Sequence, residues 1–267
     1  MSKDLVSIIM QSKDNGRYVE ETVRSVLAQT YQNWEIIFMD NSSKDNAISQ
    51  MTDLINESKI QKSDGTIENR IKVSLSVQTK DMGASLNTAL REARGKWIAF
   101  LNVGDIWLPN KLEKQIAFME DNGYAFSYTK FGVIDKLSLD RGVIIGGKEH
   151  VNYKDMQKCC WPCYLTVVYD ADKLGKMHIG NLRHNNSEYA LWLNVCEKTD
   201  CHLLPENLAK LRTKWGLFGE LLLSKKISRI YECFRIEEDM NPFMACLFTI
   251  RYGFYGLVKW FKYVERK

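Results

Sequence analysis

The sequence predicts an α/β protein whose central sheet is mostly parallel and covered by helices on both faces. Short apolar runs of strand length alternate with stretches of helical periodicity along the first 101 residues. The runs are apolar throughout, which is typical of parallel strands buried on both faces. A chain of 267 residues is also long enough to bury a complete core of this kind.

Each strand-like run is followed by a polar loop and a helical pattern. The first unit consists of a strand at Val6 to Met10, a polar stretch at Gln11 to Gly16 and a helix over Tyr18 to Ala28. Gly95 ends a later helix, because glycine favours the position just after a helix. Further strands are expected at Trp34 to Met39, Ile71 to Val77 and Trp97 to Leu101, with helices at Asn46 to Ile55 and Ala84 to Ala93.

Four polar loops directly follow the expected strands. Ligands of parallel sheets bind in the crevice outside the carboxyl ends of the strands. The sequence therefore predicts one binding crevice, formed by Gln11 to Asp14, Asp40 to Ser43, Gln78 to Gly83 and Asn102 to Asp105.

The second half of the chain is less regular. We expect one domain over residues 1–220, with halves at 1–115 and 116–220, followed by a helical tail at 221–267. Asn241-Pro242 marks a break between two tail helices. Further expected elements are a helix at Pro109 to Asn122, strands near Tyr124 to Thr129 and Leu165 to Tyr169, an insertion-like loop at Lys62 to Asn69 and a strongly amphipathic helix around Glu188 to Glu197.

The composition argues against a disordered chain and against a polytopic membrane protein. Hydrophobic residues make up 45% of the chain and charged residues 26%, with a net charge of +4. Met1 to Val6 lacks a basic and apolar leader, and no apolar stretch reaches the roughly 20 residues needed to span a bilayer. We therefore expect a cytoplasmic protein, peripheral on the inner face of the membrane if its aromatic and basic end, Phe248 to Lys267, binds there.

Cysteine and histidine spacing does not predict a metal site. The chain has seven cysteines, and only Cys159, Cys160 and Cys163 cluster, without a second pair at ligand spacing. Free, buried thiols are expected. The four histidines share no ligand spacing either; they are His150, His178, His184 and His202.

Several ordered segments match one family. They include Glu21-Thr22-Val23-Arg24-Ser25-Val26-Leu27-Ala28-Gln29-Thr30-Tyr31, Gly95-Lys96-Trp97-Ile98-Ala99-Phe100-Leu101 and Asp105-Ile106-Trp107-Leu108-Pro109-Asn110-Lys111-Leu112-Glu113-Lys114-Gln115. Together they resemble family 2 glycosyltransferases of the GT-A fold, a Rossmann-like nucleotide-sugar-binding fold, and the tail is similar to bacterial surface-polysaccharide members. The resemblance covers most of the chain and is strongest over its first 115 residues.

The resemblance implies an inverting transfer of a sugar from a nucleotide-sugar donor, UDP-linked, to a glycan or lipid-linked acceptor in surface polysaccharide biosynthesis. Nucleic acid is not an expected partner, because aromatic and basic residues form no recognised binding module. The alternative is a catalytically impaired protein of the same fold that acts as a scaffold or nucleotide-sugar-binding subunit of an assembly complex.

The resemblance places the nucleotide on the loop Asp40-Asn41-Ser42-Ser43. Asp40 would accept from a ribose hydroxyl or a base N–H, and the Asn41 amide can both donate to and accept from a pyrimidine edge. Asp40 and Ser42 could instead only shape a turn. Further expected nucleotide-sugar contacts come from the other three loops, at Gln11, Gly83, Asn102 and Asp105.

The fourth loop departs from the family pattern, which is Asp-x-Asp-Asp. Asn102, Val103, Gly104 and Asp105 stand at these positions, and the usual metal ligand is replaced by Gly104. Mg²⁺ or Mn²⁺ prefers carboxylate oxygens. Asp105 binds a divalent metal in its place, or the enzyme works without a metal, or catalysis is lost.

Cations could offset the charge of the leaving diphosphate in place of a metal. Lys13 and Lys80 are candidates, although a solvated surface lysine is an equally good interpretation of each. Arg212 stands where the family has a basic phosphate-side loop, and Lys214 replaces the usual histidine.

Inverting transfer requires a general base for the acceptor hydroxyl. The family has an Asp before an aromatic-x-Leu-Trp-Leu helix, and Glu188 occupies this position. Glu188 could also be a first-turn acid that the helix dipole favours. Trp192 is expected to pack in the core, and Trp161 either packs there or faces the acceptor.

Overall fold

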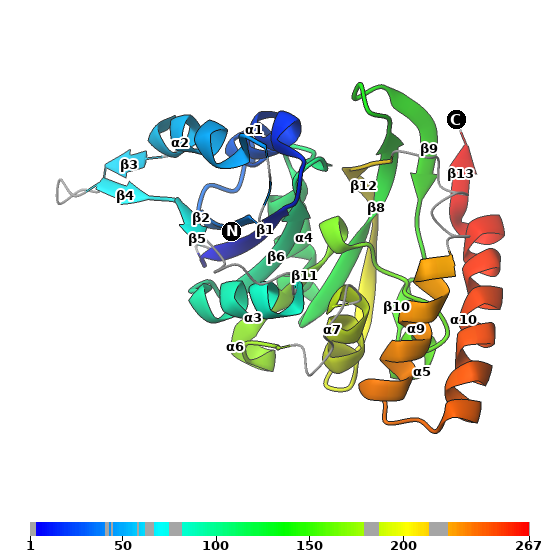
Figure 1. The fold of residues 1–267 in the computed structure, drawn as a ribbon. Coiled ribbons are helices and arrows are strands. Elements are labelled where there is room, and N and C mark those ends of the chain that lie inside the picture. Colours follow the sequence, from blue (N-terminus) through cyan, green and yellow to red (C-terminus); the bar gives the residue numbers. More distant parts are fainter. Residues whose placement is uncertain are drawn as a thin grey trace.

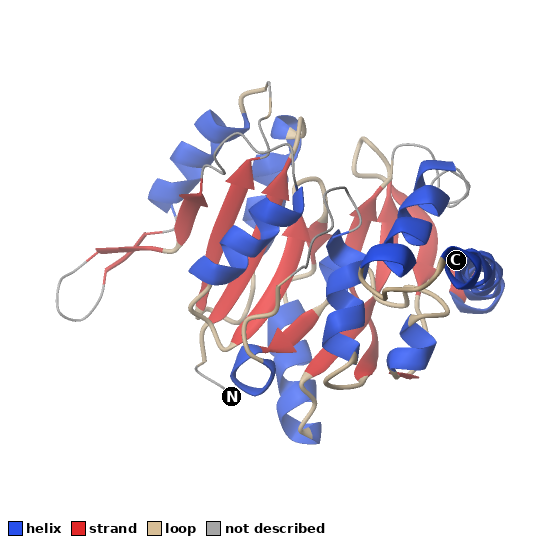
Figure 2. Cartoon of the chain, turned by 60° about the horizontal axis from the view of Figure 1, so that its bottom comes forward, coloured by secondary structure: helices blue, strands red, loops and turns tan. Residues whose placement is uncertain are grey.

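The structure, a computed structural model, describes residues 4–40, 43, 45–57, 59–61, 67–74, 82–178, 187–213 and 224–266. Its centre is a twisted mixed sheet with helices on both faces (Figures 1 and 2). This arrangement confirms the predicted α/β class, with parallel strands in its first half.

The parallel half is built around β1 (Val6–Ser12). It lies between β2 (Trp34–Asp40) and β6 (Trp97–Asn102), and β5 (Ile71–Ser74) pairs with the outer edge of β2. The register places Gln11 beside Asn102, and Ser12 beside Asp40. The carboxyl ends of the three central strands therefore meet at one edge of the sheet, as predicted.

Helices cover the two faces of this half. The fully buried β1 side chains alternate between two apolar clusters, because successive residues of a strand point to opposite faces. On one face pack α1 (Val19–Leu27), α2 (Ala47–Glu57) and α4 (Lys111–Asn122), and on the other α3 (Met82–Glu92) and α7 (Ser187–Cys196).

The second half of the sheet is mixed in direction. Its main pair is parallel, formed by β8 (Phe126–Ile134) and β12 (Cys201–Arg212). The short strand β11 (Val168–Asp170) is antiparallel to both β6 and β8 and so joins the two halves. The antiparallel additions are β7 (Ile106–Trp107), β9 (Asp140–Ile145), β10 (His150–Val151) and β13 (Val264–Arg266).

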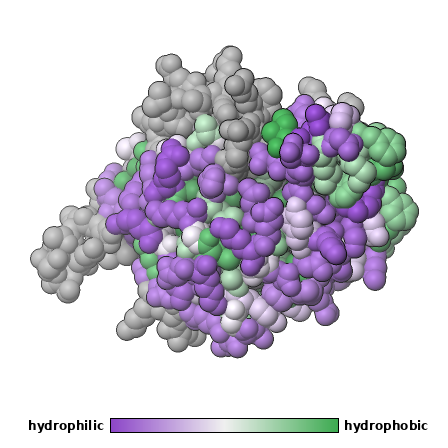
Figure 3. Space-filling view, turned by 90° about the horizontal axis from the view of Figure 1, so that it is seen from below, coloured by the Kyte–Doolittle hydropathy of each residue, from purple (hydrophilic) through white to green (hydrophobic). Residues whose placement is uncertain are grey.

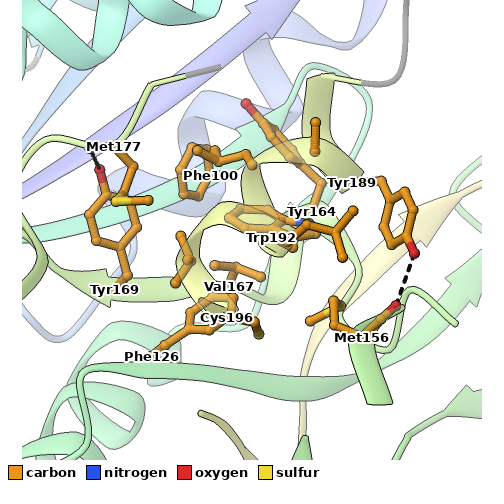
Figure 4. Close-up of a cluster of buried hydrophobic side chains, with 14 of the residues drawn as sticks. Phe100, Phe126, Met156, Tyr164, Val167, Tyr169, Met177, Tyr189, Trp192 and Cys196 are labelled. Atoms are coloured by element: carbon orange, nitrogen blue, oxygen red, sulfur yellow. Dashed lines mark hydrogen bonds between the residues drawn. The ribbon is translucent and has the colours of Figure 1, made fainter. Parts of the chain in front are cut away.

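Two expectations about local structure were wrong. The insertion-like loop contains part of a hairpin, in which β3 (Lys59–Gln61) pairs with β4 (Ile67–Asn69). Helix α7 is not amphipathic, because Tyr189 to Leu193 are all buried (Figure 4). The Trp192 ring lies 5.1 Å from the Phe100 ring centroid, as a core residue. Elements on several sides enclose α7, so the helix has no solvent-facing stripe.

The helical tail packs on the same core as the sheet. It consists of α9 (Ser224–Ile236) and α10 (Pro242–Tyr263), which lie side by side at one end of the molecule (Figure 1). Asn241 caps α10 by accepting a hydrogen bond from the Met244 N–H, so the predicted break at Asn241-Pro242 is confirmed. Among the described helices, none combines the length and apolar character required to cross a bilayer. The expected boundary after residue 220 lies outside the described residues.

Lys111 is a fully buried lysine in the first turn of α4. Its Nζ donates to Gln115 Oε1 at 2.8 Å and lies 4.4 Å from the Trp107 ring centroid. Burial lowers the pKa of Lys111 to about 7, against about 10.4 in an unfolded chain. Between these values the unfolded chain binds more protons than the folded one, so this group makes stability rise with pH.

In wild type, Lys111 makes the free energy of unfolding rise between about pH 7 and pH 10. We predict that Lys111→Met removes this rise. At pH 6 to 7 the variant should gain most relative to wild type, because the cost of a buried ammonium disappears. Urea unfolding across this pH range measures the difference. Lys114→Met, which changes a lysine with a side chain 43% exposed on the same helix, should leave the slope unchanged. A pH-independent difference between Lys111→Met and wild type would contradict the assignment.

Candidate active site

The loop from Asn102 to Asp105 is a tight turn fixed on the rest of the fold. The Asp105 N–H donates to the Asn102 carbonyl at 3.1 Å, and the Val103 N–H donates to the Gln11 carbonyl at 2.9 Å. Thr22 of α1 accepts from the Gly104 N–H and donates to the Asp105 carbonyl, both at 3.0 Å. Helix α1 thus holds this loop against the end of β1.

Gly104 has a φ of +112°, where residues with a Cβ are strained. A Cβ at this position would meet Tyr18 Cδ2 at 3.7 Å and Arg212 Cδ at 3.9 Å, which are ordinary contacts. The backbone conformation, rather than space, therefore requires glycine where relatives of the resembled family have a metal-binding acid.

Arg212 joins this loop to three other parts of the fold. The side chain is 5% exposed; Nε donates to the Gly104 carbonyl at 2.7 Å and Nη2 to Glu21 at 2.6 Å. Nη1 donates to the Asp135 carbonyl at 2.8 Å and to Ser138 Oγ at 3.0 Å, in the β8–β9 turn. Each guanidinium nitrogen thus already has an acceptor within the protein. Spacing could not have revealed Glu21 as the partner, because it lies 191 residues away in the chain.

Three buried polar atoms at the ends of β1 and β6 have no hydrogen-bond partner within the described part of the chain. They are Gln11 Nε2, Ser12 Oγ and Asn102 Oδ1. Gln11 is 6% and Ser12 1% exposed, so water does not satisfy them readily. Buried polar atoms almost always have partners, so these three atoms are available to hydrogen-bond with the polar groups of a ligand.

Asp40 organises the neighbouring loop. Both of its carboxylate oxygens accept from Ser43, one from the N–H at 2.9 Å and the other from the hydroxyl. Ser43 Oγ also accepts from the Asp14 N–H at 3.0 Å, and Asp45 accepts from the Gly16 N–H at 2.7 Å. The turn-forming role considered for Asp40 is therefore present. Its carboxylate oxygens retain lone pairs for a ribose or base.

Glu188 lies in the first turn of α7 and is half-buried. Its charge raises the pKa of Tyr164, on which burial has the larger effect in the same direction. The pKa of Cys163 is raised by burial and then by the charges of both Asp105 and Glu188. Cys163 therefore lies within electrostatic range of both acids. Tyr164 was not among the predicted site residues, although its buried hydroxyl has no partner among the described residues.

The other predicted residues fall in different places. Lys13 is exposed in the first loop, directly after β1, and Gly83 is buried in the first turn of α3. Asn41, Lys80 and Lys214 lie outside the described residues. Trp161 is buried, with its Nε1 donating to the Asp155 carbonyl at 3.0 Å, so it packs in the core.

The described residues do not provide a resident metal site. Within these ranges no group of three or more His, Cys, Asp or Glu side chains could hold an ion. Asp105 is 6% exposed, and its Oδ1 accepts from the Arg212 N–H at 2.9 Å. The Gly104 carbonyl accepts from Arg212 Nε. One partly engaged carboxylate is a poor donor set for Mg²⁺ or Mn²⁺.

The parallel half-sheet with helices on both faces, continued by a mixed half, defines a fold of the GT-A type. The sequence profile described as "Glycosyl transferase family 2" matches residues 7–164. The chain therefore belongs to glycosyl transferase family 2 and is a nucleotide-sugar glycosyltransferase.

Bacterial surface-polysaccharide enzymes are among its relatives. WfgD of Escherichia coli, a "UDP-Glc:alpha-D-GlcNAc-diphosphoundecaprenol beta-1,3-glucosyltransferase", is 29% identical over 97% of this chain and 96% of its own. The putative teichuronic acid biosynthesis glycosyltransferase TuaG of Bacillus subtilis is 33% identical over 73% of each chain. The resemblance seen in the sequence is thus confirmed.

Solved structures show the same fold at low sequence identity. Residues 1–349 of S. aureus TarS in complex with UDP-GlcNAc match with a TM-score of 0.63 and 15% identity, covering 91% of this chain and 70% of that one. The mannosyltransferase PcManGT from Pyrobaculum calidifontis, in complex with GDP-Man and Mn²⁺, matches with a TM-score of 0.63 and 12% identity over 97% of this chain and 73% of that one.

We predict that Gly104→Ala lowers the free energy of unfolding by about 1–3 kcal/mol, because alanine is strained at the observed φ. Guanidinium unfolding measures the loss. The control is Gly253→Ala, at an exposed helical position with no atom within 4 Å of the added Cβ. It should raise stability by about 0.5–1 kcal/mol. Equal stability of Gly104→Ala and wild type would show that the loop does not need this backbone conformation.

Proposed function

We propose that this protein transfers a hexose, with inversion, from a UDP-sugar to a lipid-linked acceptor during assembly of a bacterial surface polysaccharide. The names of WfgD and of a second E. coli relative, WfaP, specify UDP-Glc and a diphosphoundecaprenol-linked acceptor. The complexes of TarS with UDP and with UDP-GlcNAc support a uridine donor in this fold.

The observation that carries the proposal is the group of buried polar atoms at the carboxyl ends of β1 and β6 that have no hydrogen-bond partner in the described part of the chain. A second carboxylate, Glu188, lies on a different element, in the first turn of α7. A donor held along the strand ends would be approached by an acceptor from the side of α7. Inverting transfer needs the donor and the acceptor to lie on different sides, because the base and the leaving group act on opposite faces of the anomeric carbon.

We assign binding of the nucleoside to the ends of β1, β2 and β6. Gln11 Nε2 and Ser12 Oγ offer donors, Asn102 Oδ1 offers an acceptor, and Asp40 offers acceptors to the ribose or base. Asn41 and Gly83 complete this assignment on the two neighbouring loops.

Glu188 is proposed as the base that takes the proton of the acceptor hydroxyl as its oxygen attacks the anomeric carbon. The bond to the diphosphate then breaks, and the nucleoside diphosphate leaves with the added negative charge. Lys13 and Lys80 are the proposed counter-charges for it. Arg212 instead acts by holding the loop of Gly104 and Asp105, because its nitrogens already bind protein acceptors.

Glu188→Gln should lower kcat by about 10²–10⁴-fold while leaving the affinity for UDP-sugar within about twofold, because a general base acts in the transition state. Transfer of labelled sugar from UDP-glucose and calorimetric titration with UDP measure the two quantities. Glu197→Gln, just beyond the other end of α7 and exposed, is the matched control. Unchanged turnover in Glu188→Gln would remove this residue from the mechanism. Wild type that binds no UDP, GDP, CDP or dTDP sugar would instead favour the scaffold alternative.

We propose that no resident metal takes part, since the described donor set around Asp105 does not fit one. Turnover and UDP affinity should therefore stay within about twofold after treatment with EDTA, because a metal-independent site loses no Lewis acid. The mannosyltransferase PcManGT, whose structure contains Mn²⁺, would serve as a control that verifies the chelation. Loss of activity on chelation with recovery on adding Mn²⁺ would overturn the proposal, and Asp105→Asn would then identify whether Asp105 is the ligand.

A further inference from the structure

Helix α10 presents an apolar stripe that the described chain does not cover. The stripe consists of six exposed side chains, and Figure 3 shows apolar residues gathered at the right edge, where α10 lies in Figure 1. Their exposed fractions are 72% for Phe243, 45% for Leu247, 66% for Ile250, 61% for Phe254, 48% for Leu257 and 80% for Phe261.

The stripe belongs to a helix that is anchored on its other side. Ala245 and Gly256 are buried, and Phe248, Tyr252 and Tyr255 pack against the core. The helix is 22 residues long, which corresponds to about 33 Å at the rise of an α-helix. The core packing thus fixes the stripe in one orientation along one edge of the molecule.

The charge around the stripe selects the kind of partner. Helix α10 contains no acidic residue. Its Lys262 and the following Arg266 are exposed, whereas Arg251 and Lys259 are half-buried, with Lys259 donating inward to backbone carbonyls. Residues 224–267 contain nine Lys and Arg against five Asp and Glu, a balance of +4 that equals the net charge of the whole chain. Glu265, which follows the helix, is paired with Lys130 at 2.7 Å. A basic helix with one apolar face matches an anionic lipid surface.

A second copy of the chain is a poorer match to the stripe. The residues recur at intervals of four and three, which is also the spacing of a coiled-coil seam. Three of the six are Phe, however, and two copies of α10 would bring together only positive charges, without acids for pairs across the helices. An anionic lipid surface, in contrast, attracts the positive charges that would repel each other between two copies of α10.

The inner face of α10 reaches the acceptor side of the site. Lys259 Nζ donates to the carbonyls of Cys160 at 3.0 Å and Trp161 at 2.6 Å. The Tyr263 ring packs edge-on against Trp161, with 5.5 Å between ring centroids. Burial raises the pKa of both Cys160 and Cys163, and the charge of Glu188 adds to the rise. The helix that carries the stripe is therefore bonded to the segment beside the proposed base.

We propose that the α10 stripe docks on an anionic membrane surface and holds the Glu188 side of the site toward it. The docking goes beyond the proposed transfer reaction, although a lipid-linked acceptor would give it a purpose. Membrane docking requires neither the sugar donor nor turnover. A failure of the docking proposal can therefore be distinguished from a failure of the proposed transfer reaction.

Sedimentation of the full chain with sucrose-loaded vesicles tests the docking. Wild type should pellet with vesicles of 3:7 phosphatidylglycerol to phosphatidylcholine and much less with pure phosphatidylcholine, and high salt should weaken the binding. The Phe254→Ser, Phe261→Ser double variant should bind the anionic vesicles about tenfold or more weakly, because it loses two apolar side chains from the interface. Far-UV circular dichroism and Tm confirm that this variant stays folded.

The matched control is the Leu137→Ser, Leu139→Ser double variant. These leucines are 77% and 60% exposed on the β8–β9 turn, and their loss should leave vesicle binding unchanged. Equal pelleting of the stripe variant and wild type, or no pelleting of wild type with anionic vesicles, would overturn the proposal. So would light scattering that shows a wild-type dimer and a monomeric stripe variant, because the stripe would then bind a second copy.

Discussion

The candidate site depends on the guanidinium of Arg212. It lies nearly buried at the end of β12 and binds the Gly104 carbonyl, Glu21 and the β8–β9 turn, while its own N–H binds Asp105. A planar group with five donors can satisfy all of these acceptors together, which a lysine ammonium cannot. The loop that stands in place of the family's acidic motif is therefore held by a cation of the protein.

The contact between Arg212 and this loop changes how the incomplete acidic motif at Asn102 to Asp105 is interpreted. Gly104 removes a carboxylate, and its left-handed backbone turns its carbonyl toward Arg212. The same turn leaves Asn102 half-buried beside Gln11, and the buried atoms Asn102 Oδ1 and Gln11 Nε2 have no partner in the described chain. The loop thus retains polar groups that could bind a nucleotide, while its one carboxylate, that of Asp105, already accepts a hydrogen bond from Arg212. Loss of the motif therefore does not by itself imply loss of ligand binding.

The tail and the catalytic half form one physical unit. Ile230, Cys233, Phe234 and Ala245 of the two tail helices belong to the same apolar cluster as Phe100 and Trp192 of the sheet and α7. Helix α7 is consequently enclosed, which is why its sequence is apolar on all sides and its predicted amphipathic character was wrong. The enclosure also supports Glu188, because the turn that carries it begins a helix fixed by close packing (Figure 4).

The sequence by itself determined the class of fold, the order of the first strands and helices, the break before Pro242 and the convergence of Gln11, Asp40 and Asn102, because strand periodicity and the parallel connection leave few alternatives. It also indicated the family, through ordered segments that the comparison confirmed. Only the tertiary structure decided that Arg212 binds Glu21 and Gly104, that Trp161 lies in the core and that the described chain leaves one face of α10 uncovered. Each of these depends on partners distant in the chain, and local spacing contains no information about which side chains meet.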